Sequence, residues 1–215
     1  SKAQQDDWEN FGFILLEGFF ESKRIDRIND LINYLWRYRR KLGEEYVIDI
    51  FLDTLHERRV FFADAPTKAR LKPHKINDLY LSNSEIRELI VGKDLAIVLR
   101  DILEATPMVC NTLNLEFGSQ QEYHFDTFYM PPPTPNKMLA SWIALEDSTI
   151  DSGPLSYYPG SHKIPPYHFS NGLTNIVKGE MPRFREYVSN EIKKRNLKPV
   201  TLLAKKGDVF ISLGH

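Results

Sequence analysis

The residues best suited to chemistry in this chain are a histidine and an aspartate one position apart, His124 and Asp126, within the stretch Tyr-His-Phe-Asp-Thr. On a β-strand, residues two apart point to the same face. We therefore expect both side chains to converge on one metal ion, while Phe125 points away into the core. For so short a motif, a surface pair or a capping pair is the alternative interpretation.

One imidazole and one carboxylate are too few ligands for a tight metal site, so a third must come from elsewhere, most simply from a second histidine. Two histidines and one carboxylate on one face of the ion are typical of non-haem Fe(II) oxygenases, and they leave positions open for a co-substrate and O₂. His215, the last residue, follows Asp126 after an interval long enough for several strands. His162 lies in a Pro-Gly-Ser-His turn, where we expect a structural hydrogen-bonding role.

Composition argues against several classes of partner. The chain has 215 residues, with 28 basic and 29 acidic side chains and a formal net charge of −1. This balance gives no electrostatic basis for nucleic acid or a membrane as the partner. No apolar run reaches the roughly 18 residues of a membrane span, and the start has no signal-peptide pattern. Cys110 is the only cysteine, so no internal disulfide and no cysteine-based zinc site can form. We expect a cytoplasmic protein.

The spacing of apolar residues changes near Pro107 from helical to extended. Before it, Ser22 and Ser84 are the expected N-caps of two long helices. Helices are predicted at about 3–10, 23–41, 85–104 and 183–195. Strands are predicted at 12–16, 108–117, 138–145, 154–158, 200–204 and 209–213, with a hairpin turn joining the last two. Residues 47–52 fit a strand or a helix.

Helices followed by short strands with glycine and proline turns indicate an α+β protein. We expect an antiparallel β-sandwich or barrel to carry the site, with helices packed outside it. One domain is predicted over 1–215, helical over about 1–105 and β-rich over about 106–215. An insertion over about 164–198, with its one helix, is expected to act as a lid over the substrate.

The sequence also predicts where several single residues outside the motif lie. We expect His56, His74 and His168 at the surface or in loops, and Cys110 buried as a small apolar residue. Tyr129, Tyr157 and Tyr158 fit a substrate pocket and an aromatic core equally well.

Five short motifs occur in a specific order. They are Gly118 to Asp126, Trp142 to Asp147, Gly153 to Leu155, Pro159 to Lys163, and Gly207 to Phe210 followed by His215. In this order and spacing, the chain resembles the phytanoyl-CoA dioxygenase-like family of Fe(II)/2-oxoglutarate oxygenases. The resemblance implies a double-stranded β-helix, a jelly-roll or cupin-like barrel with mostly N-terminal flanking helices. It also implies that His124, Asp126 and His215 hold Fe(II).

The resemblance further implies that 2-oxoglutarate and O₂ are co-substrates, with hydroxylation of a small molecule and release of succinate and CO₂. Trp142 matches a family position that lines the co-substrate pocket, and Gln121 and Asn111 are weaker candidates for contacts there. Asp126 argues against halogenation, because related halogenases carry a small residue at that position.

The family also has an arginine shortly after the distal histidine, which pairs with the far carboxylate of 2-oxoglutarate. Since this chain stops at His215, we expect its C-terminal end to be missing. A non-catalytic jelly-roll binding protein and a cupin-like metal enzyme that does not use 2-oxoglutarate are the alternative functions.

Overall fold

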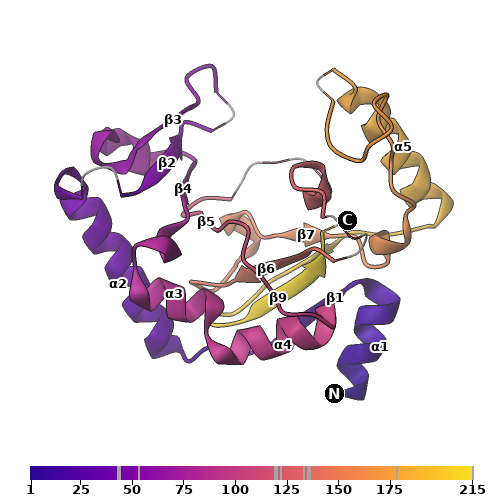
Figure 1. Ribbon diagram of the computed structural model, residues 1–215, viewed down its shortest axis with the longest axis horizontal. Helices are drawn as coiled ribbons and strands as arrows, with labels where there is room; N and C mark the ends of the chain where they lie inside the picture. Colours follow the sequence, from indigo (N-terminus) through magenta and orange to yellow (C-terminus); the bar gives the residue numbers. More distant parts are fainter. Residues whose placement is uncertain are drawn as a thin grey trace. The chain divides into compact units, whose positions relative to one another are not determined.

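The computed structural model describes residues 1–42, 45–52, 54–118, 121, 123–132, 134, 137–177 and 179–214 (Figure 1). His215 lies outside these residues. The chain divides into two compact units. Unit 1 consists of Ser1–Phe20, Glu122–Ser148 and Pro154–His215, and unit 2 of Glu21–Gln121 and Thr149–Gly153. Unit 1 therefore combines the start of the chain with most of its second half.

Unit 1 is built on a three-stranded antiparallel sheet of order β1-β9-β6, formed by β1 (Phe13–Leu16), β6 (Leu139–Ile143) and β9 (Val209–Leu213). Strand β9 is central, and Val209 and Ile211 in it are fully buried. An almost unbroken apolar run suits a strand with neighbours on both sides and cover on its faces. The central strand of the sheet is thus the one that leads to the end of the chain.

A separate two-stranded sheet pairs β7 (Ser156–Tyr157) with β8 (Val200–Thr201). The predicted hairpin between 200–204 and 209–213 is therefore wrong, because β8 pairs with β7 while β9 pairs with β1 and β6. The turn between them is held elsewhere. The Asp208 carboxylate accepts hydrogen bonds from the backbone N–H of Gly18 at 2.7 Å and of Lys205 at 2.8 Å.

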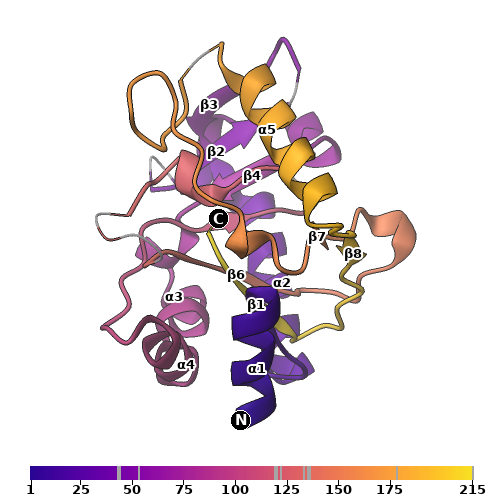
Figure 2. The same ribbon diagram turned by 90° about the vertical axis from the view of Figure 1, so that its right-hand side faces the viewer.

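Helices α1 (Lys2–Phe11) and α5 (Met181–Lys194) complete unit 1 (Figure 2). The Pro-Gly-Ser-His turn holds the C-terminal end of α1: Gly160 N–H donates to Phe11 O at 2.9 Å, and His162 Nε2 lies 3.3 Å from Glu9 O. Gly12 ends the helix at φ +79°, and a Cβ there would meet the His162 ring at 2.3 Å. The structural role predicted for His162 is confirmed.

Unit 2 contains helices α2 (Ser22–Tyr38), α3 (Ser84–Val91) and α4 (Lys93–Leu103). Its antiparallel sheet has the order β3-β2-β4-β5, formed by β2 (Val47–Ile50), β3 (Arg58–Phe61), β4 (His74–Asn77) and β5 (Leu113–Asn114). Helix α2 buries the apolar stripe expected from its spacing, which includes Ile25, Ile28 and Leu35.

Several local predictions for unit 2 are wrong. The single helix expected over 85–104 is broken at Gly92, whose extended backbone (ψ 153°) separates α3 from α4. Asn83 caps α3 in place of Ser84, because its side chain accepts the Ile86 N–H at 3.0 Å. Helix α2 begins at Ser22 itself, with Glu21 at the N-cap. Of the strand expected over 108–117, only Leu113–Asn114 pairs.

Two side chains of unit 2 occupy unexpected places. His74 is fully buried, not exposed, because its Nδ1 bonds Lys72 O at 2.8 Å and its ring meets the Trp36 ring edge-on at 5.1 Å. Cys110 is exposed, not buried. The predicted α+β class is confirmed by the mixture of helices and antiparallel sheets. None of the described helices is long and apolar enough to cross a membrane.

Candidate metal centre

His124 and Asp126 lie in unit 1, where Asp126 begins a short 3-10 helix, Asp126–Phe128. The expected strand is wrong here. Phe125 is extended (φ −104°, ψ 132°), but the chain then turns, with Phe128 N–H donating to Phe125 O at 3.0 Å. The two side chains converge nevertheless, since His124 Nε2 lies 3.4 Å from Asp126 Oδ1.

This separation suits two ligands of one metal ion. Two atoms that each lie about 2.1 Å from an ion, at right angles, are about 3.0 Å apart. The 3.4 Å between His124 Nε2 and Asp126 Oδ1 is close to that value. Their side chains are 25% and 39% exposed, so a further ligand can reach them from solvent. The pair can therefore supply one nitrogen and one oxygen to an ion.

Within the part of the chain that the structure describes, no group of three or more histidine, cysteine, aspartate or glutamate side chains forms a metal site. The predicted third ligand, His215, is outside that part. Its neighbour Gly214 is described, and Gly214 O accepts the N–H of Thr127 at 2.9 Å. The last described residue before His215 is thus bonded to the residue that follows Asp126.

Trp142 lies on an aromatic face of the β1-β9-β6 sheet. It pairs directly with Phe210, and directly paired residues of antiparallel strands share a face. The Phe210 ring meets the Tyr157 ring at 5.5 Å. Burial raises the pKa of Tyr157, a hydrogen bond with Ser161 offsets part of this effect, and the Asp126 carboxylate raises the pKa further. Tyr157 therefore connects the face that carries Trp142 with the surroundings of Asp126.

Tyr129 contacts His124, and Tyr123, the residue before His124, contacts Tyr158. The Tyr129 ring meets the His124 ring edge-on at 5.6 Å, and the Tyr123 and Tyr158 rings meet at 4.9 Å. Tyr123 and Tyr129 are each 52% exposed. From the sequence, Tyr129 and Tyr158 fitted a substrate pocket and an aromatic core equally well, and Tyr123 had no predicted role. The position of Tyr123 directly before His124 was the signal that could have indicated one.

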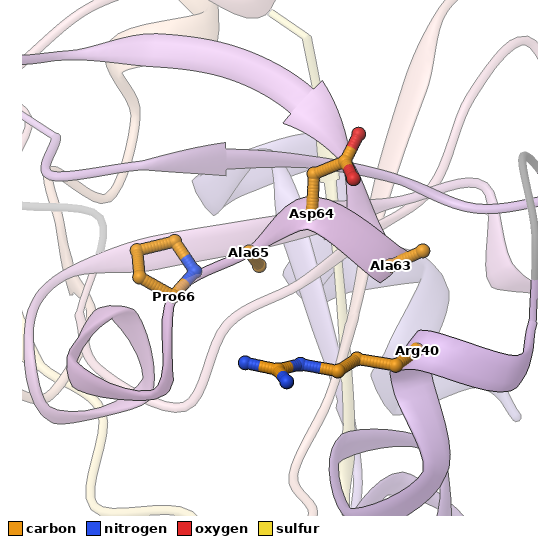
Figure 3. Close-up of a pocket in the computed structure, with 5 residues that line it drawn as sticks. All are labelled: Arg40, Ala63, Asp64, Ala65 and Pro66. Atoms are coloured by element: carbon orange, nitrogen blue, oxygen red, sulfur yellow. The ribbon is translucent and has the colours of Figure 1, made fainter.

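Asn111 and Gln121 belong to unit 2, so their contacts with a co-substrate stay predictions. The same unit has a surface pocket lined by Arg40, Ala63, Asp64, Ala65 and Pro66. Figure 3 shows the Arg40 guanidinium extending beneath Ala65 and the Asp64 carboxylate pointing away from it. This pocket contains none of the predicted site residues.

Sequence comparison identifies relatives of this chain. The family profile described as phytanoyl-CoA dioxygenase (PhyH) matches residues 8–215. Phytanoyl-CoA dioxygenase domain-containing protein 1 from Mus musculus is 24% identical over an alignment of 190 positions, which covers 75% of this chain. The Rattus norvegicus protein of the same name gives the same identity and coverage. The chain spans 65% of the length of these two relatives.

Solved structures show the same fold. The non-heme alpha ketoglutarate dependent carbocyclase SnoK from nogalamycin biosynthesis is 16% identical, with a TM-score of 0.70 over 99% of this chain and 74% of that chain. The epimerase SnoN, solved with Fe³⁺, alpha ketoglutarate and nogalamycin RO, is 16% identical, with a TM-score of 0.62 over 99% of this chain and 73% of that chain. Since the family profile spans residues 8–215, the chain belongs to the phytanoyl-CoA dioxygenase family.

Proposed function

We propose that this protein is an Fe(II)- and 2-oxoglutarate-dependent dioxygenase that hydroxylates a small organic molecule and releases succinate and CO₂. The observation that carries the proposal is the 3.4 Å approach of His124 Nε2 to Asp126 Oδ1 in a chain of this family. Two solved relatives support the choice of cofactors. SnoN was solved with Fe³⁺ and alpha ketoglutarate, and HygX from Streptomyces hygroscopicus with nickel and 2-oxoglutarate.

In this proposal His124, Asp126 and His215 hold the metal ion. Asp126 offsets part of the charge of a divalent ion, and imidazole nitrogens suit iron. His124 must present a deprotonated Nε2 to bind, so its ring proton would be on Nδ1. The Thr127–Gly214 hydrogen bond supports His215 as the third ligand, because adjacent Cα atoms are about 3.8 Å apart. When bound, the iron and 2-oxoglutarate together supply O₂ activation.

We also propose that both units belong to one oxygenase domain over 1–215 with a double-stranded β-helix as its core. The family profile runs through both units, and the likeness to solved structures supports this fold. Trp142, on the aromatic face that reaches Tyr157, would line the 2-oxoglutarate pocket, with Gln121 and Asn111 as further contacts. The exposed Tyr123 and Tyr129 rings would meet the organic substrate beside His124.

The proposal is tested by adding Fe(II) and 2-oxoglutarate to the protein without oxygen. A weak visible charge-transfer band should develop in the wild-type protein and be lost in His124→Ala and in Asp126→Ala. His56→Ala is the matched control, because His56 is exposed and in unit 2. Persistence of the band in both ligand variants would contradict the ligand assignment. Absence of the band from metal-loaded wild-type protein would reject the function.

The same titration separates the alternative functions. Metal binding without a 2-oxoglutarate band would indicate a cupin-like metal enzyme, and no metal binding would indicate a binding protein. A substrate screen that measures succinate release then identifies the organic substrate. Mass spectrometry of the product tests the outcome, because hydroxylation adds one oxygen atom, ring closure removes two hydrogens and epimerisation leaves the mass unchanged.

A further inference from the structure

An aromatic cluster joins the 164–198 insertion to the segment that carries His124 and Asp126, here called the metal pair. Phe128, Phe169 and Phe184 form its core and are 2%, 3% and 1% exposed. The side chains packed against this core are Phe125, Tyr167, Val177, Met181 and Val188. All of them belong to unit 1. We call this set the Phe184 cluster.

Phe184 is far from His124 and Asp126 in the sequence but packs against residues that flank Asp126. It comes from helix α5, and its ring meets Phe128 edge-on at 4.3 Å and Phe125 at 5.9 Å. Phe125 lies between the two ligands in sequence, and Phe128 ends the 3-10 helix that Asp126 begins. The prediction that Phe125 points into packing is confirmed. One side chain of the insertion therefore contacts residues on both sides of Asp126.

Backbone hydrogen bonds hold the same segment at two further points. Ile176 N–H, from the insertion, donates to Phe128 O at 3.2 Å, while Thr127 N–H donates to Gly214 O at 2.9 Å. The 3-10 helix Asp126–Phe128 has only three residues. A 3-10 turn of this length has little stability of its own. Its geometry therefore depends on the ring contacts and hydrogen bonds made by the surrounding segments. The insertion supplies a large share of them.

The insertion is itself braced. Glu180, just before α5, accepts hydrogen bonds from the Ser170 N–H at 3.0 Å and from the Ser170 hydroxyl. Tyr187, on α5, donates its hydroxyl to Pro165 O at 2.7 Å. Figure 2 shows the loop that precedes α5 beside the upper end of this helix. These hydrogen bonds hold the loop against helix α5 on either side of Phe184, at Glu180 and at Tyr187.

We propose that Phe184 is a positioning residue for the metal ligands and that the 164–198 insertion thereby sets metal affinity. A shift of the 3-10 helix would move Asp126 relative to His124 and change the 3.4 Å spacing of their donor atoms. This inference rests on the proposed function for the identity of the ion. It assigns the insertion a role that differs from covering the substrate.

The test compares Phe184→Leu with Phe62→Leu, a matched loss of volume at a fully buried phenylalanine of unit 2. Hydrogen–deuterium exchange of residues 123–130 is measured without metal, and Co²⁺ affinity by calorimetry. We expect Phe184→Leu to speed exchange across this segment and to weaken Co²⁺ binding about 10-fold or more, as loss of support for metal ligands does elsewhere. Phe62→Leu should change neither.

Each result decides the proposal. Unchanged exchange and Co²⁺ affinity in Phe184→Leu would overturn it, and so would an equal loss of affinity in Phe62→Leu, which would indicate general destabilisation. A raised KM for the organic substrate with unchanged Co²⁺ affinity would leave only a lid role. If the wild-type protein binds no Co²⁺, the proposed function and the metal role both fail. The exchange measurement still decides whether Phe184 supports the segment.

Discussion

Replacing Asp208 with alanine should destabilise unit 1 by about 2 to 4 kcal/mol, because two backbone donors lose a charged acceptor. Asp208 is 4% exposed and accepts from Gly18 N–H at 2.7 Å and Lys205 N–H at 2.8 Å, one with each carboxylate oxygen. Each donor left unpaired in a buried place costs about 1 to 3 kcal/mol. Both donors are only partly buried, so the lower part of that range applies.

The measurement is urea unfolding followed by circular dichroism. With a slope of about 2 to 3 kcal/mol per molar urea, the expected loss lowers the midpoint by about 1 M at an unchanged slope. Asp208→Asn should lose less, because its amide oxygen keeps one acceptor while its NH₂ group faces the other donor.

Asp147→Ala is the matched control for Asp208→Ala. Asp147 accepts from Lys206 N–H at 2.9 Å and Lys205 Nζ at 3.1 Å, but it is exposed. Water can replace these bonds, so Asp147→Ala should lower the midpoint much less. Equal urea midpoints for Asp208→Ala and Asp147→Ala would refute the argument that burial increases the contribution of the Asp208 hydrogen bonds to stability.

Three further predictions concern backbone fit, pH and substrate contact. Gly207→Ala should lower the urea midpoint, because Gly207 has φ +96° and a Cβ would lie 2.1 Å from Phe20 O. Burial acts to raise the pKa of Asp49, but hydrogen bonds and charge from Arg59 outweigh it and lower the pKa. Asp49 thus adds stability above about pH 4, and this stability is lost as pH falls through the lowered pKa. Arg59→Ala should therefore begin to unfold at a higher pH than the wild-type protein in an acid titration monitored by circular dichroism. Tyr129→Ala should raise the KM of the substrate found by the succinate screen several-fold and leave Co²⁺ affinity unchanged.

Local patterns predicted the elements whose stability depends on their own sequence. The bounds of β9 agree with the predicted 209–213, because an apolar run between Asp208 and Gly214 leaves little choice. Helix α5 also agrees closely with the predicted 183–195, because its apolar residues lie four apart. The pairing of β9 was missed because its partner strands, β1 and β6, are far away in the sequence. No local pattern contains that information.

The candidate site was predicted in part. Residue types and spacing identified His124 and Asp126, and the direction of Phe125 followed from alternation. The backbone was nevertheless a turn and not a strand, and Phe128 in that turn packs on Phe184 from a distant helix. The packing partners of Phe125 and Phe128 could not be found from sequence, since nothing local indicates that an insertion packs against the segment with the two candidate ligands.

The hydrogen bond between Thr127 and Gly214 has a consequence for how the protein would respond to its metal. It closes the loop between Thr127 and Gly214, next to the end of the β6–β9 pairing. Under the proposed ligand set, an ion held by Asp126 and His215 would close the same loop a second time, as a cross-link does. Chelation should then release the end of β9 before the rest of the sheet, and added metal should raise the thermal midpoint in proportion to the logarithm of its free concentration. A bound metal would thus stabilise the fold in addition to its role in catalysis.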